Sequence, residues 1–176
     1  MSDRIMSFRN SLIFKFLLKI QEYILIICSV ATVIIIGIEV ALRYFFRADL
    51  LGYEEIVIIL AMWLYFLGGS YTTYKKNHIS AEVVNLFLTE RAQKIVALFV
   101  SIITMIVAII FALWGFDFFR WALERKAMTS GLRIPLLLSQ SALFFGYLMM
   151  AFYSLVYAIE DILLFIGWQK KNAEGI

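Results

Sequence analysis

No charged side chain occurs in three long stretches of this chain, which cover residues 56–74, 95–116 and 134–159. They contain 19, 22 and 26 residues. An α-helix rises 1.5 Å per residue, so about 20 apolar residues cross a hydrocarbon core about 30 Å thick. A fourth stretch, residues 20–42, reaches this length if the carboxylates near its two ends lie at the membrane surfaces. Backbone groups in lipid must be paired within their own element, so we predict four transmembrane helices.

The composition agrees with a membrane protein and excludes an ordinary soluble domain. Hydrophobic residues make up 63% of the 176 residues and charged residues 16%, whereas globular domains contain about 45–50% and about 25%. A soluble chain of this length has too much surface for its volume to hide so much apolar area from water. One proline and no linker-like segment indicate a single membrane domain over residues 1–176. The predicted fold class is an all-α membrane protein.

The first 19 residues are expected to form an amphipathic helix that lies in the membrane interface. Ile5, Phe8, Leu12 and Phe16 follow the spacing of one helical face, which would rest on the apolar part of the bilayer. Phe14 interrupts the polar face. A basic tail that frays at the membrane surface is therefore the alternative.

The basic residues are distributed unequally between the two sides of the predicted bundle. Ten of the 16 Lys and Arg residues fall on the side of the two termini and six on the other side. The positive-inside rule therefore predicts that both termini are cytoplasmic. The difference is small, because the segment 117–133 alone carries four basic residues.

Catalytic chemistry is not expected in this chain. Cys28 and His78 are its only cysteine and histidine, which excludes an intrachain disulfide, a cysteine zinc site and a haem held by two histidines of the chain. A serine nucleophile needs a base aimed at it, and Ser80 is too close to His78 along the chain for that geometry. We therefore predict no enzymatic activity and no cofactor.

Four charged residues near the predicted membrane edge are candidates for structural ion pairs. Glu39 and Arg43 are four residues apart on the first helix, a spacing that allows an ion pair. Glu54 and Glu55 are expected to open the second helix, where negative charge suits the helix dipole. If the first two helices form a hairpin, Arg43 pairs with one of these glutamates or with a partner subunit.

Two further positions carry structural expectations. Gly68 and Gly69, followed by a serine, form a patch of small residues where another helix could approach closely. Glycines that have no such partner are the alternative interpretation. After the third charge-free stretch, Asp117, Arg120 and Glu124 share one helical face, so we expect that helix to continue beyond the hydrocarbon core.

The sequence resembles the small membrane subunit of TRAP transporters, the DctQ-like family, over most of its length. Five segments carry the resemblance, and their order is more specific than any one of them. In chain order they are Arg43-Tyr44-Phe45-Phe46, Tyr53-Glu54-Glu55, Leu67-Gly68-Gly69-Ser70, Lys75-Lys76-Asn77-His78-Ile79 and Ser130-Gly131-Leu132-Arg133-Ile134-Pro135. The chain departs from the family at Tyr53, where a tryptophan is expected.

The resemblance implies a tripartite importer in the bacterial inner membrane. A periplasmic binding protein would capture an organic acid, such as a sialic acid or a dicarboxylate, and a large multi-span subunit would move it inward with sodium. The small subunit would act as a scaffold beside the moving part and help to dock the binding protein. The candidate interface or structural residues are Arg43, Glu54, Glu55, Gly68, Gly69, His78, Arg120 and Pro135.

Two other classes of protein are less well supported by the sequence. A self-sufficient small exporter needs a carboxylate in mid-membrane, and the middles of the predicted spans contain none. A membrane anchor of a redox complex needs haem ligands or a quinone site, and a single histidine at a helix edge gives little support for either.

Overall fold

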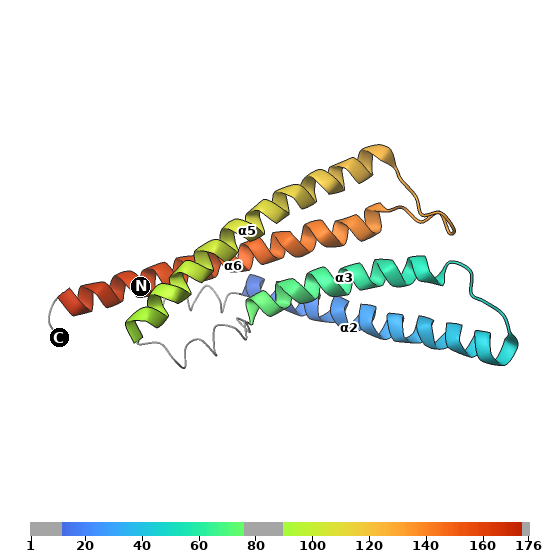
Figure 1. The fold of residues 1–176 in the computed structure, drawn as a ribbon, viewed down its shortest axis with the longest axis horizontal. Helices are drawn as coiled ribbons and strands as arrows, with labels where there is room; N and C mark the ends of the chain where they lie inside the picture. The colour runs from blue at the N-terminus through green and yellow to red at the C-terminus, as the bar shows by residue number, and fades with distance from the viewer. Residues whose placement is uncertain (1–11, 76–89, 174–176) are drawn as a thin grey trace.

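The structure is a computed structural model of the chain, and it describes residues 12–75 and 90–173. Within these ranges the chain is almost entirely helical. The elements are α2 (Leu12–Ala41), a π-helical turn η1 (Leu42–Phe46), α3 (Tyr53–Tyr74), α5 (Glu90–Arg125) and α6 (Leu137–Ala173). Figure 1 shows them as two helical hairpins, one formed by α2 and α3 and the other by α5 and α6.

Four helices of the described residues are long and apolar enough to cross a membrane. The predicted fold class, an all-α protein with four such helices, is therefore confirmed. Residues 12–19, which the sequence assigned to an interfacial helix, are helical and continuous with the rest of α2. α5 continues to Arg125 and α6 to Ala173, both beyond the charge-free stretches. α6 begins three residues later than residue 134, because Pro135 and its neighbours form a tight turn first.

The helices pack in the spatial order α2, α3, α6, α5. α6 lies between α3 and α5, and α2 packs along α3. In Figure 1 the helices converge near the middle of the molecule, and α2 and α5 diverge toward the ends that carry the hairpin loops. α2 and α5 therefore form the two edges of the bundle.

Two glycines allow the closest helix contacts. A Cβ at Gly146 of α6 would lie 2.5 Å from the Cβ of Phe66 and 2.9 Å from its carbonyl carbon and oxygen. A Cβ at Gly115 of α5 would lie 2.9 Å from Leu143 Cδ2 and 3.3 Å from the Phe144 Cα. In lipid, apolar side chains gain little by leaving the hydrocarbon for one another, so close packing of backbones is a main source of helix association.

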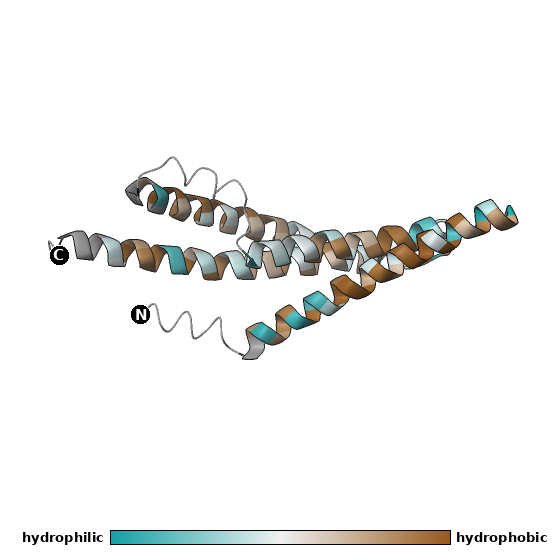
Figure 2. Cartoon of the chain, turned by 90° about the horizontal axis from the view of Figure 1, so that it is seen from below, coloured by the Kyte–Doolittle hydropathy of each residue, from teal (hydrophilic) through white to brown (hydrophobic). Residues whose placement is uncertain are grey.

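Large apolar side chains cover the outside of the bundle, while small ones fill much of its interior. Five alanines are buried, namely Ala108, Ala122, Ala142, Ala151 and Ala158. Along α2 and α5, by contrast, Val33 and Trp114 leave 69% and 63% of their surfaces exposed. Figure 2 shows hydrophobic residues along the middle of α2 and hydrophilic residues near its ends. This distribution is expected when the surrounding solvent is lipid.

Candidate functional site: two polar ties between helices

A buried network of hydrogen bonds joins α2, α3 and α6. Gln21 Nε2 donates to Ser70 Oγ at 3.1 Å, and the Tyr153 hydroxyl donates to Gln21 Oε1 at 3.0 Å. Ser70 Oγ donates in turn to the carbonyl of Leu67 at 2.8 Å. Ser70 and Tyr153 are fully buried, and Gln21 is 4% exposed. We call these three residues the three-helix network. Each forms a hydrogen bond with another member, because a polar group buried in a membrane protein is costly without a partner.

Aromatic rings close the network on one side. The Phe14 ring packs edge-on against Tyr153, with their centroids 5.3 Å apart, and its centroid lies 5.6 Å from that of Tyr74. The Tyr157 hydroxyl donates to the backbone carbonyl of Tyr74, the last residue of α3. Carbonyls in the last turn of a helix lack a partner within the helix. α6 thus caps the end of α3 where the aromatic rings gather.

A second tie joins the start of α3 to the loop between α5 and α6. Glu55 accepts hydrogen bonds from the backbone amides of Gly131, at 2.6 Å to Oε1, and Leu132, at 2.8 Å to Oε2. We call these three residues the loop clamp. Two successive amides that point at one carboxylate form a small anion-binding nest.

The loop is shaped by its own hydrogen bonds. Thr129 N donates to the carbonyl of Ile134 at 2.9 Å, and Ile134 N donates to Thr129 Oγ1 at 2.9 Å. Beside this pair, Met128 and Pro135 form an isolated β-bridge. Pro135 thus stands in a closed turn just before α6, where its carbonyl accepts from Leu138 N at 3.1 Å.

The electrostatics of the loop clamp favour the charged form of Glu55. This residue precedes the charge-free stretch 56–74 and lies outside the apolar segment. Hydrogen bonds from the Thr129 side chain, from Leu132 N and from Gly131 N hold the pKa of its carboxyl below the usual value of 4.5. Donors stabilise a carboxylate but offer nothing comparable to a protonated carboxyl. The tie is therefore made by the carboxylate at neutral pH.

Glycine is required where the two hairpin loops meet. Gly52, the residue before α3, has φ 81°, a conformation that strains residues with a Cβ. A Cβ there would also lie 2.4 Å from Leu132 Cγ. A Cβ at Gly131 would lie 3.0 Å from Glu55 Oε1. The loop therefore sits directly against the start of α3.

The ion pairs that the sequence predicted for Arg43 are not formed within the described chain. Glu39 is buried, at 6% exposed, and its Oε2 accepts from Leu50 N at 2.9 Å. Glu55 is engaged by the loop amides, and Glu54 and Arg43 are both exposed. Glu39 and Glu55 lie near helix ends, where backbone amides without a helical partner are available. Both carboxylates accept hydrogen bonds from such amides instead of pairing with the arginine. The alternative, a partner subunit for Arg43, stays a prediction.

The glycine patch is not at a close helix crossing among the residues that the structure describes, and the approach of a helix from another subunit stays a prediction. A Cβ at Gly68 would have only Leu25 Cδ2 within 4 Å, at 3.9 Å, and one at Gly69 would meet the flexible Cε of Met150 at 3.3 Å. The close helix crossings within this chain lie at Gly115 and Gly146 instead. The sequence signal that could have indicated the second crossing is the pair Ala142 and Gly146, two small residues four apart on one face.

Arg120 Nε lies 3.7 Å from Glu124 Oε1, an exposed ion pair on the extended end of α5. Glu54 and Glu55 lie in the first turn of α3, as predicted. His78 lies outside the described residues. No group of three or more His, Cys, Asp or Glu residues that could hold a metal occurs in residues 12–75 and 90–173.

Sequence reasoning missed Gln21 and Tyr153, the two largest members of the three-helix network. Gln21 lies between Lys19 and Glu22, where it looks like one more polar residue at a membrane edge. Tyr153 lies inside a long apolar stretch, where a tyrosine fits as a bulky apolar side chain. Nothing in either local sequence names the partner, because the two residues are 132 positions apart.

Residues 32–164 match the family model described as Tripartite ATP-independent periplasmic transporters, DctQ component. The chain belongs to the DctQ family. No curated protein sequence matches the chain closely enough to count as a relative.

Membership assigns this DctQ chain to the small membrane component of a TRAP transporter. Such components are non-catalytic, and they work with a large membrane subunit and a periplasmic binding protein in the bacterial inner membrane. The resemblance stated from the sequence is thus confirmed at the level of the family. The two ties describe how this DctQ chain holds its four helices in one arrangement.

Proposed function

We propose that this DctQ chain is the scaffold of a sodium-coupled importer of organic acids, a sialic acid or a dicarboxylate. The large subunit would carry the substrate and the sodium ions, and this chain would hold it in a fixed position. The chain would also help to dock the periplasmic binding protein. Both termini would be cytoplasmic, in keeping with the excess of basic residues on that side.

One observation carries the scaffold proposal. The side chains of the three-helix network, which are buried where α2, α3 and α6 meet, form hydrogen bonds with one another. The hydrogen-bonding groups of these side chains are therefore occupied by Gln21, Ser70 and Tyr153 themselves and are not free to bind a substrate or an ion. The edges of the bundle present apolar side chains such as Val33 and Trp114. A surface of this kind fits lipid or another membrane protein rather than a hydrophilic organic acid.

Transport in liposomes tests the proposal. This chain, the large subunit and their complex are reconstituted separately, with a sodium gradient, the binding protein and radiolabelled sialic acid or dicarboxylate. We expect uptake only by the complex, and none above empty liposomes by this chain alone. Uptake by the purified single chain would contradict the scaffold role.

Cysteine labelling tests the proposed orientation. The native Cys28 is buried, so it gives a low background. Ser130→Cys places a thiol in the loop between α5 and α6, and Ser2→Cys places one near the N-terminus. In intact spheroplasts a membrane-impermeant maleimide should label the first variant and not the second. The reverse pattern would place the termini outside.

Arg43 is proposed as a contact for the large subunit. It is exposed in η1 and has no ion pair among the residues that the structure describes. Arg43→Ala should reduce the amount of large subunit that co-purifies, whereas Arg47→Ala, a matched change four residues further, should not. Equal recovery of the large subunit with both variants would leave Arg43 without a role in assembly.

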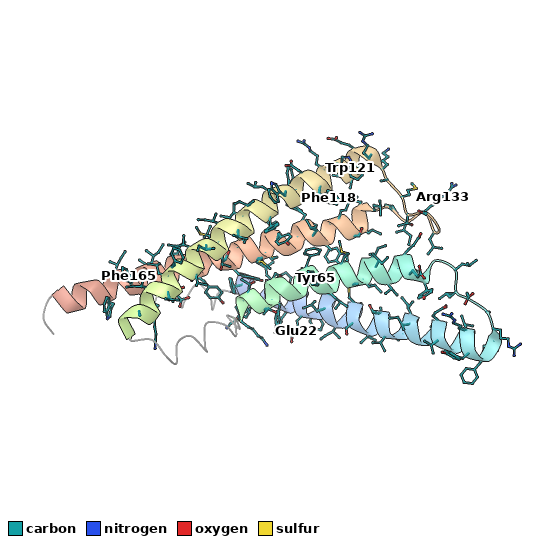
Figure 3. The ribbon with its side chains drawn as sticks, in the orientation of Figure 1. Glu22, Tyr65, Phe118, Trp121, Arg133 and Phe165 are labelled. Carbon is teal, nitrogen blue, oxygen red and sulfur yellow. The ribbon has the colours of Figure 1, made fainter. Side chains whose placement is uncertain are left out.

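Docking of the binding protein is proposed at the loop between α5 and α6. Arg133 lies at the tip of this loop, as Figure 3 shows, and it is exposed. Exposed charges at the edge of an interface act mainly on the rate of association. Arg133→Glu should slow binding of the binding protein to the complex, measured by surface plasmon resonance at low salt. Lys19→Glu, at the opposite end of the bundle, should leave that rate unchanged.

A further inference from the structure

A groove of about 850 Å³ runs between α3 and α5, with α6 as its floor. Gly68, Gly69 and Thr72 line it from α3, and Val107 and Tyr147 line it from the other two helices. The Thr72 hydroxyl donates to the carbonyl of Gly68 at 2.9 Å. The Thr73 hydroxyl donates to the carbonyl of Gly69 at 3.0 Å. Most of the lining is apolar, and these two hydroxyls are bonded within α3, which suits an apolar occupant.

Packing within the chain does not explain the two glycines in this groove. A Cβ at Gly68 would have one atom within 4 Å, at 3.9 Å, and one at Gly69 would meet the end of a flexible methionine. Glycine is the least favourable residue in a helix apart from proline. The glycines leave the wall of the groove without side chains and so keep it deep.

A positive charge stands at one end of the groove. Gly68, Thr72 and Lys75 are spaced four and three residues apart, so they follow one face of α3 toward its C-terminal end. The Lys75 ammonium lies 4.8 Å from the centroid of the Tyr71 ring, and it has no ion pair among the described residues.

We propose that the groove binds an acyl chain of one anionic phospholipid, with its phosphate at Lys75. Under the proposed orientation this end faces the cytoplasmic leaflet, whose anionic lipids are attracted to basic residues next to membrane helices. A bilayer supplies acyl chains to any open apolar groove, and the lysine selects among headgroups. The bound lipid is thus a structural ligand of this DctQ chain, in addition to its partner subunits.

Native mass spectrometry of the purified complex, in mild detergent with added lipid, tests this proposal. The probes are dioleoyl phosphatidylglycerol, which is anionic, and dioleoyl phosphatidylcholine, which is zwitterionic. Val107→Trp fills the groove, and Ile106→Trp is its control, because Ile106 is exposed on α5 but does not line the groove. Wild type and Ile106→Trp should each retain one more phosphatidylglycerol than Val107→Trp does.

Removing the charge tests the headgroup site without filling the groove. Lys75→Gln should lower the preference for phosphatidylglycerol over phosphatidylcholine roughly fivefold, the size expected for one basic residue near a membrane surface. Lys19→Gln, an exposed lysine on α2, should leave the preference unchanged. Equal preference in both lysine variants would overturn the proposal.

The groove-filling pair also separates the lipid from a helix of the large subunit. If Val107→Trp releases the large subunit while the lipid count stays constant, a protein helix occupies the groove and the proposal is wrong. The proposal rests on the proposed orientation but not on transport. A complex that binds lipid as expected and transports nothing would contradict only the proposed function.

Discussion

The three-helix network and the loop clamp both tie α3 to its neighbours, but in opposite surroundings. The network is made of neutral side chains, and two of its three members are fully buried. The loop clamp is made of a carboxylate and two backbone amides at an exposed edge. The hydrogen bonds have similar lengths, from 2.6 to 3.1 Å.

The difference lies in what replaces each bond when it breaks. Water can solvate Glu55 and the loop amides, so breaking the clamp costs little beyond the lost order of the loop. The Tyr153 hydroxyl and Gln21 are buried inside the bundle, so water does not readily replace their bonds. The buried tie therefore fixes how the helices pack, and the exposed tie fixes the position of a loop.

Gly146→Leu should have the largest effect, because it acts on α3 between the two ties. The Gly146 Cβ position is 2.5 Å from the Phe66 Cβ, so a side chain there forces α3 away from α6. We expect a loss of at least about 3 kcal/mol of stability, at or above the upper end of the usual overpacking range. The free energy of unfolding in mixed detergent and dodecyl sulfate micelles measures it. Gly37→Leu is the control, since no atom lies within 4 Å of a Cβ there.

Gln21→Leu should have the next largest effect, and it sharpens the comparison at the buried tie. The change leaves the Tyr153 hydroxyl buried without a partner, while Ser70 keeps its bond to Leu67. A buried unsatisfied group costs about 1–3 kcal/mol. The double variant Gln21→Leu with Tyr153→Phe removes the stranded hydroxyl and should recover much of the loss. A double variant as unstable as the sum of both single changes would show that the network is not coupled.

Glu55→Gln should affect the loop rather than the stability of the bundle. A neutral amide accepts more weakly from Gly131 N and Leu132 N than a carboxylate does. A spin label on Ser130→Cys should become more mobile in electron paramagnetic resonance spectra, with little change in thermal midpoint. Glu54→Gln, which alters an exposed neighbour, should leave the label unchanged. A fall in thermal midpoint as large as that of Gln21→Leu would remove the distinction between the two ties.

Acid should have the same effect as Glu55→Gln, but only at low pH. The folded pKa of Glu55 lies below the usual 4.5, so the clamp contributes in full above that value and is lost as the pH falls through the folded pKa. The mobility of the spin label should therefore stay constant from pH 7 to pH 5 and rise only below the usual carboxyl pKa. A rise near pH 6 would contradict the assignment to Glu55.

Arg120→Ala should have the smallest effect. Its side chain and that of Glu124 are 64% and 69% exposed, and exposed pairs at this helical spacing contribute about 0.3–0.5 kcal/mol. Even this should disappear at high salt, because water and ions screen the pair. The thermal midpoint at low and high ionic strength measures the effect. A large fall in the thermal midpoint of the complex at both ionic strengths would show that Arg120 contacts the large subunit instead.

The sequence predicted the helices more fully than the contacts between them. Charge-free stretches showed where the chain crosses the membrane, and Glu54 and Glu55 showed where α3 begins. Helix ends were less well determined, since α5 and α6 both extend beyond the apolar stretches. The carboxylates at the membrane edge were recognised, but their partners were not, because Glu55 meets amides 76 and 77 residues away.

The sequence by itself determined that this chain is a bundle of four membrane-spanning helices without an expected catalytic site. The reason is that lipid demands long apolar helices and admits few polar groups, and both demands are visible residue by residue. Only the tertiary structure decided that Gln21 meets Ser70 and Tyr153, and that the helices cross at Gly115 and Gly146. In lipid the outer face of a helix is apolar like most of its inner face, so hydrophobic periodicity, which marks the buried face in water, carries little information here.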